Sequence, residues 1–206
     1  MAATPTARRK LLDAAAELFY REGVGATGVD RISAEAGVSK RSLYQHFQSK
    51  DALIAAALAD KGAAVLDRYI PADRDSTSAR EKILDVFDTL RTWSCSADFR
   101  GCPFANVATE LTDPTHPARA VARDYKLRLR SYLAHQAEIG GARDPDALAE
   151  QLLMLFDGAI ANAMINNGPV PDGAHAAAEI LLDAHGLVSE RLQNREDRSH
   201  TAFGSS

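Results

Sequence analysis

Apolar residues recur at helical spacing along most of this chain. In the first such segment, residues 6–22, Leu11, Ala15 and Leu18 lie on one face of a predicted helix. Runs of alternating Val, Ile, Thr and Tyr bounded by hairpin turns, which would indicate strands, are missing. The pattern therefore predicts an all-α fold.

Glycine, proline and capping residues divide this pattern into nine predicted helices. They span residues 6–22, 27–36, 40–47, 50–69, 79–94, 103–111, 117–139 and 144–166, and a ninth begins at residue 172. The polar stretch 73–78 separates the fourth helix from the fifth and is the expected seam in the chain. The polar residues after Asn194 predict a disordered tail over residues 196–206.

Residues 23–50 predict two short helices joined by a tight turn, which is the sequence form of a helix-turn-helix. Thr27 is the expected N-cap of the first helix, and Asp30 three residues later suits a capping box. Gly37 can adopt the positive φ that the turn needs, and Ser39 can cap the second helix. The motif predicts a DNA-binding element.

The second of these helices presents two different faces. Leu43 and Phe47, four residues apart, are expected in the core, whereas Arg41 and Gln45 share another face. Arginine suits the guanine edge and glutamine the adenine edge. Eight residues give a rod of roughly 12 Å, about the width of the DNA major groove.

Charge is distributed unevenly along the 206 residues, whose net charge is −4. The first 50 residues hold eight Lys or Arg and five Asp or Glu, so the remaining chain carries −7. Such a split suits a phosphate-binding head on an acidic body, although a solvated surface would also account for it. No apolar run reaches 18 residues and no signal peptide is evident, so a cytoplasmic protein without membrane contact is expected.

The helix-turn-helix region resembles the TetR family of bacterial transcriptional regulators. The matching positions are Thr27, Ile32, Ala36-Gly37-Val38-Ser39-Lys40, Leu43-Tyr44, His46-Phe47, Ser49-Lys50 and Asp51-Ala52-Leu53. The family usually has Gly at position 41 and often Thr at 42, where this chain has Arg41 and Ser42. Because this helix reads the operator, the departure concerns which DNA sequence is read. The order of the nine predicted helices also matches the family's architecture.

The resemblance implies three parts and a set of DNA contacts. Residues 1–50 would form the DNA-binding domain, 51–195 the ligand-binding and dimerisation domain, and 196–206 the tail. Phosphate contacts carried over by position are Ser39, Lys40, Tyr44, His46, Lys50 and the amide of Thr27. Arg41, Ser42 and Gln45 are the predicted base readers. The implied function is a repressor that binds a palindromic operator as a dimer and is released by a small molecule.

A second apolar face on the last two helices predicts a partner for the body. In the resembled family, these two helices pair across a two-fold axis into a four-helix dimer interface. The predicted interface residues are Ala161, Ala177, Leu181 and Leu187.

The large side chains of the body gather where the resembled family encloses its effector. The predicted ligand-binding residues are Phe87, Leu90, Trp93, Phe104, Asn106, His116, Tyr125, Met154, Phe156 and Asn162. Plain core packing is the alternative, because aromatic residues at helical spacing most often form the core.

Two cysteines, Cys95 and Cys102, leave one further alternative open, a DNA-binding thiol redox sensor; the other reading is two inert small hydrophobes. No Cys/His cluster has metal-ligand spacing, and no nucleophile-base motif or phosphate-binding glycine loop is present. No metal, cofactor or enzymatic activity is expected. The effector, the operator and the regulated genes cannot be named from the sequence.

Overall fold

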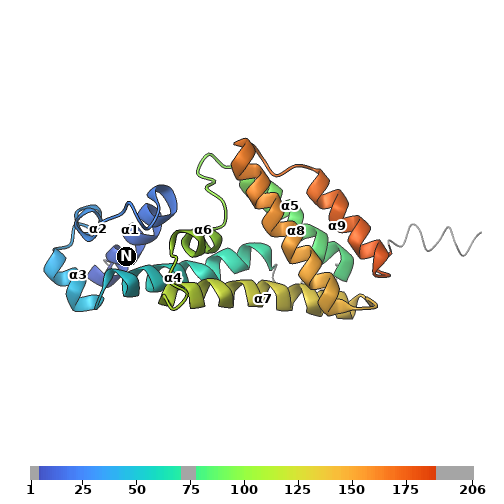
Figure 1. Ribbon diagram of the computed structural model, residues 1–206, viewed down its shortest axis with the longest axis horizontal. Coiled ribbons are helices and arrows are strands. Elements are labelled where there is room, and N and C mark those ends of the chain that lie inside the picture. The colour runs from blue at the N-terminus through green and yellow to red at the C-terminus, as the bar shows by residue number, and fades with distance from the viewer. Residues whose placement is uncertain (1–4, 71–77, 189–206) are drawn as a thin grey trace, which may run out of the picture. The chain divides into compact units, whose positions relative to one another are not determined.

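The computed structural model describes residues 5–70 and 78–188, and this part of the chain contains nine α-helices and no strand (Figure 1). The helices are α1 (Ala7–Glu22), α2 (Val29–Ala36), α3 (Lys40–His46), α4 (Lys50–Tyr69), α5 (Ala79–Ser94), α6 (Pro103–Glu110), α7 (Pro117–Ile139), α8 (Pro145–Asn166) and α9 (Gly173–Ala184). The all-α prediction is confirmed. The predicted seam lies mostly outside the described residues, and the predicted tail lies entirely outside them.

Capping side chains set most helix starts where the sequence predicts them. The hydroxyl of Ser39 accepts from the Ser42 amide at 3.2 Å, and the carboxylate of Asp144 accepts from the Ala147 amide at 3.0 Å. Ser78 and Glu81 form a complete capping box at the start of α5.

The predicted capping box of Thr27 and Asp30 is wrong. Helix α2 starts at Val29, with Gly28 as an N-cap that makes no side-chain bond. The Thr27 hydroxyl turns backward and donates to the Gly23 carbonyl at 2.7 Å, because that carbonyl lies beyond the end of α1 and needs a donor.

The chain forms two compact units. Unit 1 comprises Met1–Arg68 and Ser96–Arg128, and unit 2 comprises Tyr69–Cys95 and Leu129–Ser206. The predicted domain boundary after residue 50 therefore lies inside unit 1, where α4, α6 and the first half of α7 join the helix-turn-helix. The three functional domains remain a prediction.

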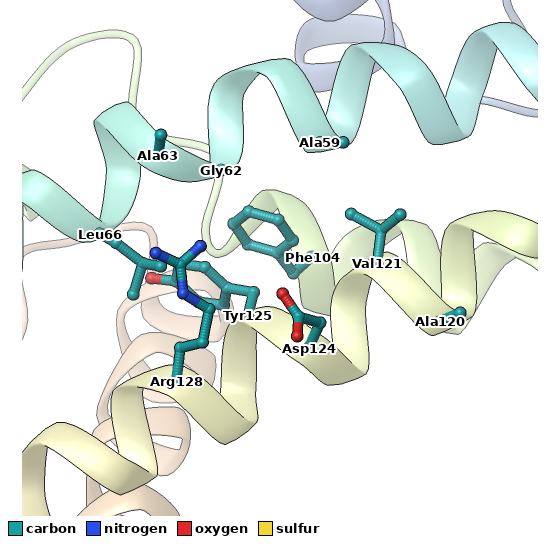
Figure 2. A pocket seen from close by; sticks show the side chains of 10 residues that line it. All are labelled: Ala59, Gly62, Ala63, Leu66, Phe104, Ala120, Val121, Asp124, Tyr125 and Arg128. Atoms are coloured by element: carbon teal, nitrogen blue, oxygen red, sulfur yellow. The ribbon is translucent and has the colours of Figure 1, made fainter.

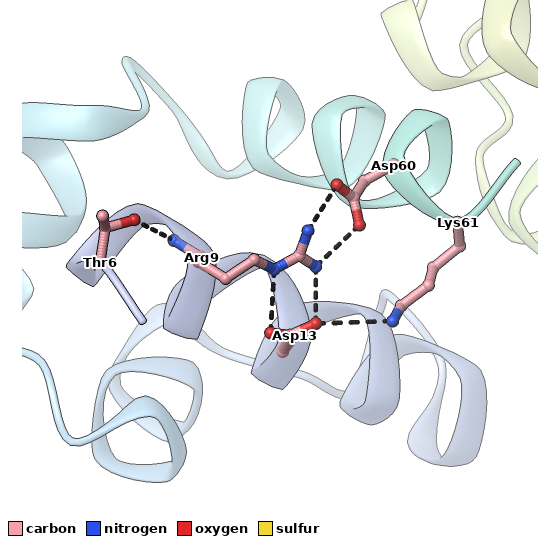
Figure 3. A network of polar contacts seen from close by, with 5 residues as sticks. All are labelled: Thr6, Arg9, Asp13, Asp60 and Lys61. Carbon is pink, nitrogen blue, oxygen red and sulfur yellow. Dashed lines mark hydrogen bonds and ion pairs between the residues drawn. The ribbon is translucent and has the colours of Figure 1, made fainter. Parts of the chain in front are cut away.

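In unit 1, α1 packs on α2 and α3 around fully buried apolar side chains that include Leu11, Ile32 and Leu43. An ion-pair network joins α1 to α4 on the outside of this core (Figure 3). The Arg9 guanidinium donates to Asp13 at 2.6 and 2.9 Å and to Asp60 at 2.7 Å through two nitrogens. These hydrogen bonds lower the pKa of both carboxyls.

In unit 2, α8 packs on α9 and both contact α5 (Figure 1). Tyr69, Phe87 and Phe156 form an edge-to-face cluster in its core, with ring centroids 5.1 Å apart for Tyr69–Phe156 and 6.5 Å for Phe87–Phe156. Among the described residues, α8 alone is long and apolar enough to cross a membrane by length and composition. The core helix of a soluble protein meets the same criterion.

Candidate nucleic-acid interface

Helix α3 presents a polar face to solvent because its two apolar residues anchor it in unit 1. Leu43 is fully buried and Phe47, the C-cap residue, is 5% exposed. The Arg8 guanidinium covers the Phe47 ring at 5.5 Å from its centroid. The predicted DNA contacts Arg41, Tyr44, Gln45 and His46 are all exposed, and Ser42 is half-buried. The structure thus brings the predicted base readers together on one accessible helix.

The turn before α3 takes the conformation that the sequence predicts. Gly37 has φ +61°, and its amide and that of Val38 donate to carbonyls of the last turn of α2. A β-carbon at this φ would be strained, so glycine allows the chain to reverse direction here.

Lys40 lies at the start of α3 beside Asp30 of α2, with Nζ 2.9 Å from a carboxylate oxygen. The hydrogen bond to Asp30 and the negative charge of its carboxylate raise the pKa of the Lys40 ammonium. The ammonium is solvent-exposed, so it can exchange this partner for a phosphate. Its contact with DNA remains a prediction.

Two other predicted phosphate contacts have roles inside the fold. Thr27 has 0% exposed surface, which leaves neither its hydroxyl nor its amide accessible, so the structure argues against a phosphate contact there. Lys50 is half-buried, and its Nζ donates to the Val24 carbonyl at 2.5 Å. The buried role of Thr27 could have been inferred from its position four residues after Gly23, because its hydroxyl donates to the Gly23 carbonyl.

A pocket of about 450 Å³ lies within unit 1 between α4, α6 and α7 (Figure 2). Of the predicted ligand-binding residues it includes Phe104 and Tyr125, whose rings stack at 3.7 Å with an angle of 9°. The other lining residues are Ala59, Gly62, Ala63, Leu66, Ala120, Val121, Asp124 and Arg128. The small α4 residues and the two charged α7 residues were not among the predicted ligand contacts. In sequence these residues look like ordinary helix surface, and only the packing of α4 near α7 shows that they line a pocket.

Asn106 and His116 do not line this pocket. The Asn106 amide donates to the Arg100 carbonyl at 2.6 Å. His116 is buried: Nδ1 accepts from the Ala118 amide at 3.1 Å, and Nε2 lies 3.3 Å from an Asp51 carboxylate oxygen. Both side chains hold loops of unit 1 in place.

The remaining predicted ligand-binding residues lie in unit 2. Phe87, Leu90 and Phe156 are buried in its core, and Trp93 is half-buried with its ring 6.4 Å from Tyr69. This arrangement favours the core-packing alternative for these residues.

Met154 and Asn162 are exposed on α8, so a place inside a cavity of unit 2 is wrong for both. Residue type was the only basis for predicting that these two side chains contact a ligand. Residue type does not reveal which face of a nearly all-apolar helix is buried.

The predicted dimer residues divide in the same way. Ala161 is exposed, and Ala177 and Leu181 are half-buried, which leaves them available to a partner. Leu187 is not available: it is 4% exposed, lies beyond the end of α9 and packs against Gly140. Its carbonyl accepts from Arg80. Leu187 therefore closes unit 2, and its assignment to the interface is wrong.

Cys95 is exposed in unit 2, and Cys102 is buried in unit 1. The described residues contain no group of three or more His, Cys, Asp or Glu side chains that could hold a metal ion.

Comparison with known proteins identifies the class of this site. The sequence profile described as "Bacterial regulatory proteins, tetR family" matches residues 11–57, from α1 into α4. The chain is 44% identical to a crystal structure described as a TetR transcriptional regulator from Streptomyces avermitilis. The match covers 88% of this chain and 98% of the other, with a TM-score of 0.84.

Two further relatives agree. The HTH-type transcriptional repressor DhaR of Mycobacterium sp. strain GP1 is 28% identical, over 92% of this chain and 98% of DhaR. The HTH-type transcriptional regulator LmrA of Bacillus subtilis is 29% identical, over 57% of this chain and 63% of LmrA. The chain belongs to the TetR family and is a DNA-binding transcriptional regulator. Its relatives are transcriptional regulators rather than enzymes.

Proposed function

We propose that this protein is a cytoplasmic, homodimeric repressor that binds a palindromic operator and is released by a small-molecule effector. The observation that carries the proposal is the exposed polar face of α3, with Arg41 and Gln45 held outward by the buried Leu43. Repression is proposed over activation because the relative DhaR is a transcriptional repressor.

In this proposal, residues of α3 and its flanks divide into two kinds of contact. Arg41, Ser42 and Gln45 read base edges in the major groove. The phosphate contacts are Ser39, Lys40, Tyr44, His46 and Lys50, which fix register and dominate affinity without encoding sequence.

Dimerisation supplies the second half-site. Helix α8 carries an exposed stripe of Met154, Gly158, Ala161 and Ile165, spaced so that they share one face. On α9, Ile180 is 68% exposed, with Ala177 and Leu181 beside it. A two-fold pairing of these helices would cover both surfaces. Reading two half-sites of a palindrome requires two α3 helices spaced by about one DNA turn (~34 Å).

The α4/α6/α7 pocket is the proposed effector site. Its walls are mainly small or aliphatic residues and the stacked Phe104–Tyr125 pair, with Asp124 and Arg128 as the charged groups. Its volume suits a small molecule. The ligand would bind more tightly to a dimer whose two α3 helices are not spaced to enter successive major grooves. It would then lower the affinity for DNA, and bound DNA would lower the affinity for the ligand by the same factor.

Selection from a random DNA library with the purified protein tests the DNA-binding part. The expected product is an inverted repeat with half-site centres about 10 base pairs apart. A single half-site without symmetry, bound by a monomer, would contradict the dimer. Placing the selected site over a promoter tests the sign of regulation, because a repressor lowers reporter expression and an activator raises it.

A further inference from the structure

The turn between α1 and α2, Gly23–Gly25, is held by side chains from three places. The Thr27 hydroxyl donates to the Gly23 carbonyl at 2.7 Å, and the Lys50 ammonium of α4 donates to the Val24 carbonyl at 2.5 Å. The Gly25 amide donates to the carboxylate of Glu110, the last residue of α6, at 3.0 Å. The turn leads directly into α2, so these contacts set where the helix-turn-helix begins.

The carboxylate of Glu110 lies close to Gly23, which has no side chain. A β-carbon at Gly23 would lie 2.9 Å from one Glu110 carboxylate oxygen and 3.0 Å from the other. Gly23 also has φ +88°, where other residues are strained. An acidic residue at a helix C-terminus is unfavourable to its own helix, because the carbonyl end of the dipole is negative. The carboxylate is therefore best explained by its bond to the Gly25 amide.

Helix α6 also meets the helix-turn-helix on its N-terminal side. The Tyr20 hydroxyl of α1 donates to the Gly101 carbonyl at 3.1 Å and accepts from the Arg100 amide at 2.8 Å. Burial raises the pKa of this phenol. The residues just before α6 thus contact the end of α1, and the last residue of α6 contacts the turn that follows α1.

We propose that Glu110 is a positioning residue for DNA binding, which holds the α1–α2 turn through the Gly25 amide.

Three substitutions at Glu110 separate hydrogen bonding from charge. Glu110→Gln keeps an acceptor at the same reach without the charge, and Glu110→Asp keeps the charge but shortens the reach by one methylene. Positioning predicts that E110Q binds the selected duplex like wild type, whereas E110D and E110A bind about tenfold more weakly, the loss of roughly one such bond. Glu17→Ala, an exposed glutamate elsewhere in unit 1, is the matched control and should change nothing.

Hydrogen exchange at the Gly25 amide gives a second readout that needs no DNA. Exchange should speed up in E110A and E110D, and stay slow in E110Q and E17A. Unchanged exchange in E110A would overturn the proposal, whatever DNA selection shows. Tighter DNA binding in both E110A and E110Q would also overturn it, because Glu110 would then act only by repelling phosphates. Should E110A fail to fold, the contrast between E110Q and E110D carries the same test.

Discussion

Replacing Ile180 with Glu tests the proposed dimer without disturbing the monomer. Ile180 is 68% exposed, so the monomer loses little packing when its side chain changes. Full burial of an isoleucine contributes about 1.5–3 kcal/mol, so covering the exposed part of this one contributes about 1–2 kcal/mol per subunit. An isologous interface contains the residue twice, which gives about 2–4 kcal/mol. Each unpaired carboxylate buried there costs several kcal/mol more.

The expected loss therefore exceeds about 6 kcal/mol, or a factor of ~10⁴ in the dimer dissociation constant. Sedimentation equilibrium should find I180E monomeric where wild type is dimeric, and circular dichroism should find the monomer still helical. Affinity for the selected palindrome should collapse, although α3 is untouched. Leu127→Glu is the control, because Leu127 of α7 is also an exposed apolar residue but lies outside α8 and α9. An I180E protein that stays dimeric with full affinity would place the interface elsewhere.

Three further predictions concern unit 1. Arg41→Ala should cost ~1–3 kcal/mol on the selected site and relax preference at one symmetric pair of positions; equal losses on random DNA would reduce Arg41 to a phosphate contact. Lys50→Ala should lower the slope of log K against log salt by about 0.9 per subunit if its ammonium reaches a phosphate, whereas its bond to Val24 alone predicts a lower melting temperature and an unchanged slope. Because Arg9 lowers the pKa of Asp13 and Asp60 in the folded state, their contribution to stability is present above about pH 4 and is lost as the pH falls through those lowered values; acid titration of Arg9→Met should show less of this loss than wild type.

The cysteines allow one inexpensive check. Replacing Cys95 and Cys102 with serine should leave release from DNA unchanged under oxidant if the two thiols are inert. If the wild-type protein dissociates from DNA on oxidation and the double variant does not, the redox-sensor alternative is supported instead.

Local rules account for what could be predicted from the sequence. The nine helices and the turn at Gly37 follow from spacing, caps and glycine alone, which depend on residues close in the chain. Thr27 shows where such rules fail. Its hydroxyl had two possible partners, the start of α2 and the Gly23 carbonyl, and only the folded turn decides between them.

Faces of apolar helices could not be predicted for a different reason. Nearly every side of α8 is apolar, so periodicity does not reveal that Phe156 points inward while Met154 is 61% exposed. Which side is buried depends on contacts with the neighbouring helix α9 and with α5, which is distant in sequence. The same holds for Leu187, whose spacing suits α9 but which lies past its end.

Helix α4 shows how two functions can share one short stretch of sequence. Asp60 receives the Arg9 guanidinium of α1, and Lys61 lies 3.5 Å from Asp13 (Figure 3). The adjoining Ala59 and Gly62 line the pocket against α6 and α7 (Figure 2). Residues 59–62 therefore place both sets of contacts within about one helical turn, so a ligand in the proposed effector pocket would contact the same turn of α4 that is ion-paired to α1. The small residues bring α4 close to Phe104, and the charged ones join it to α1.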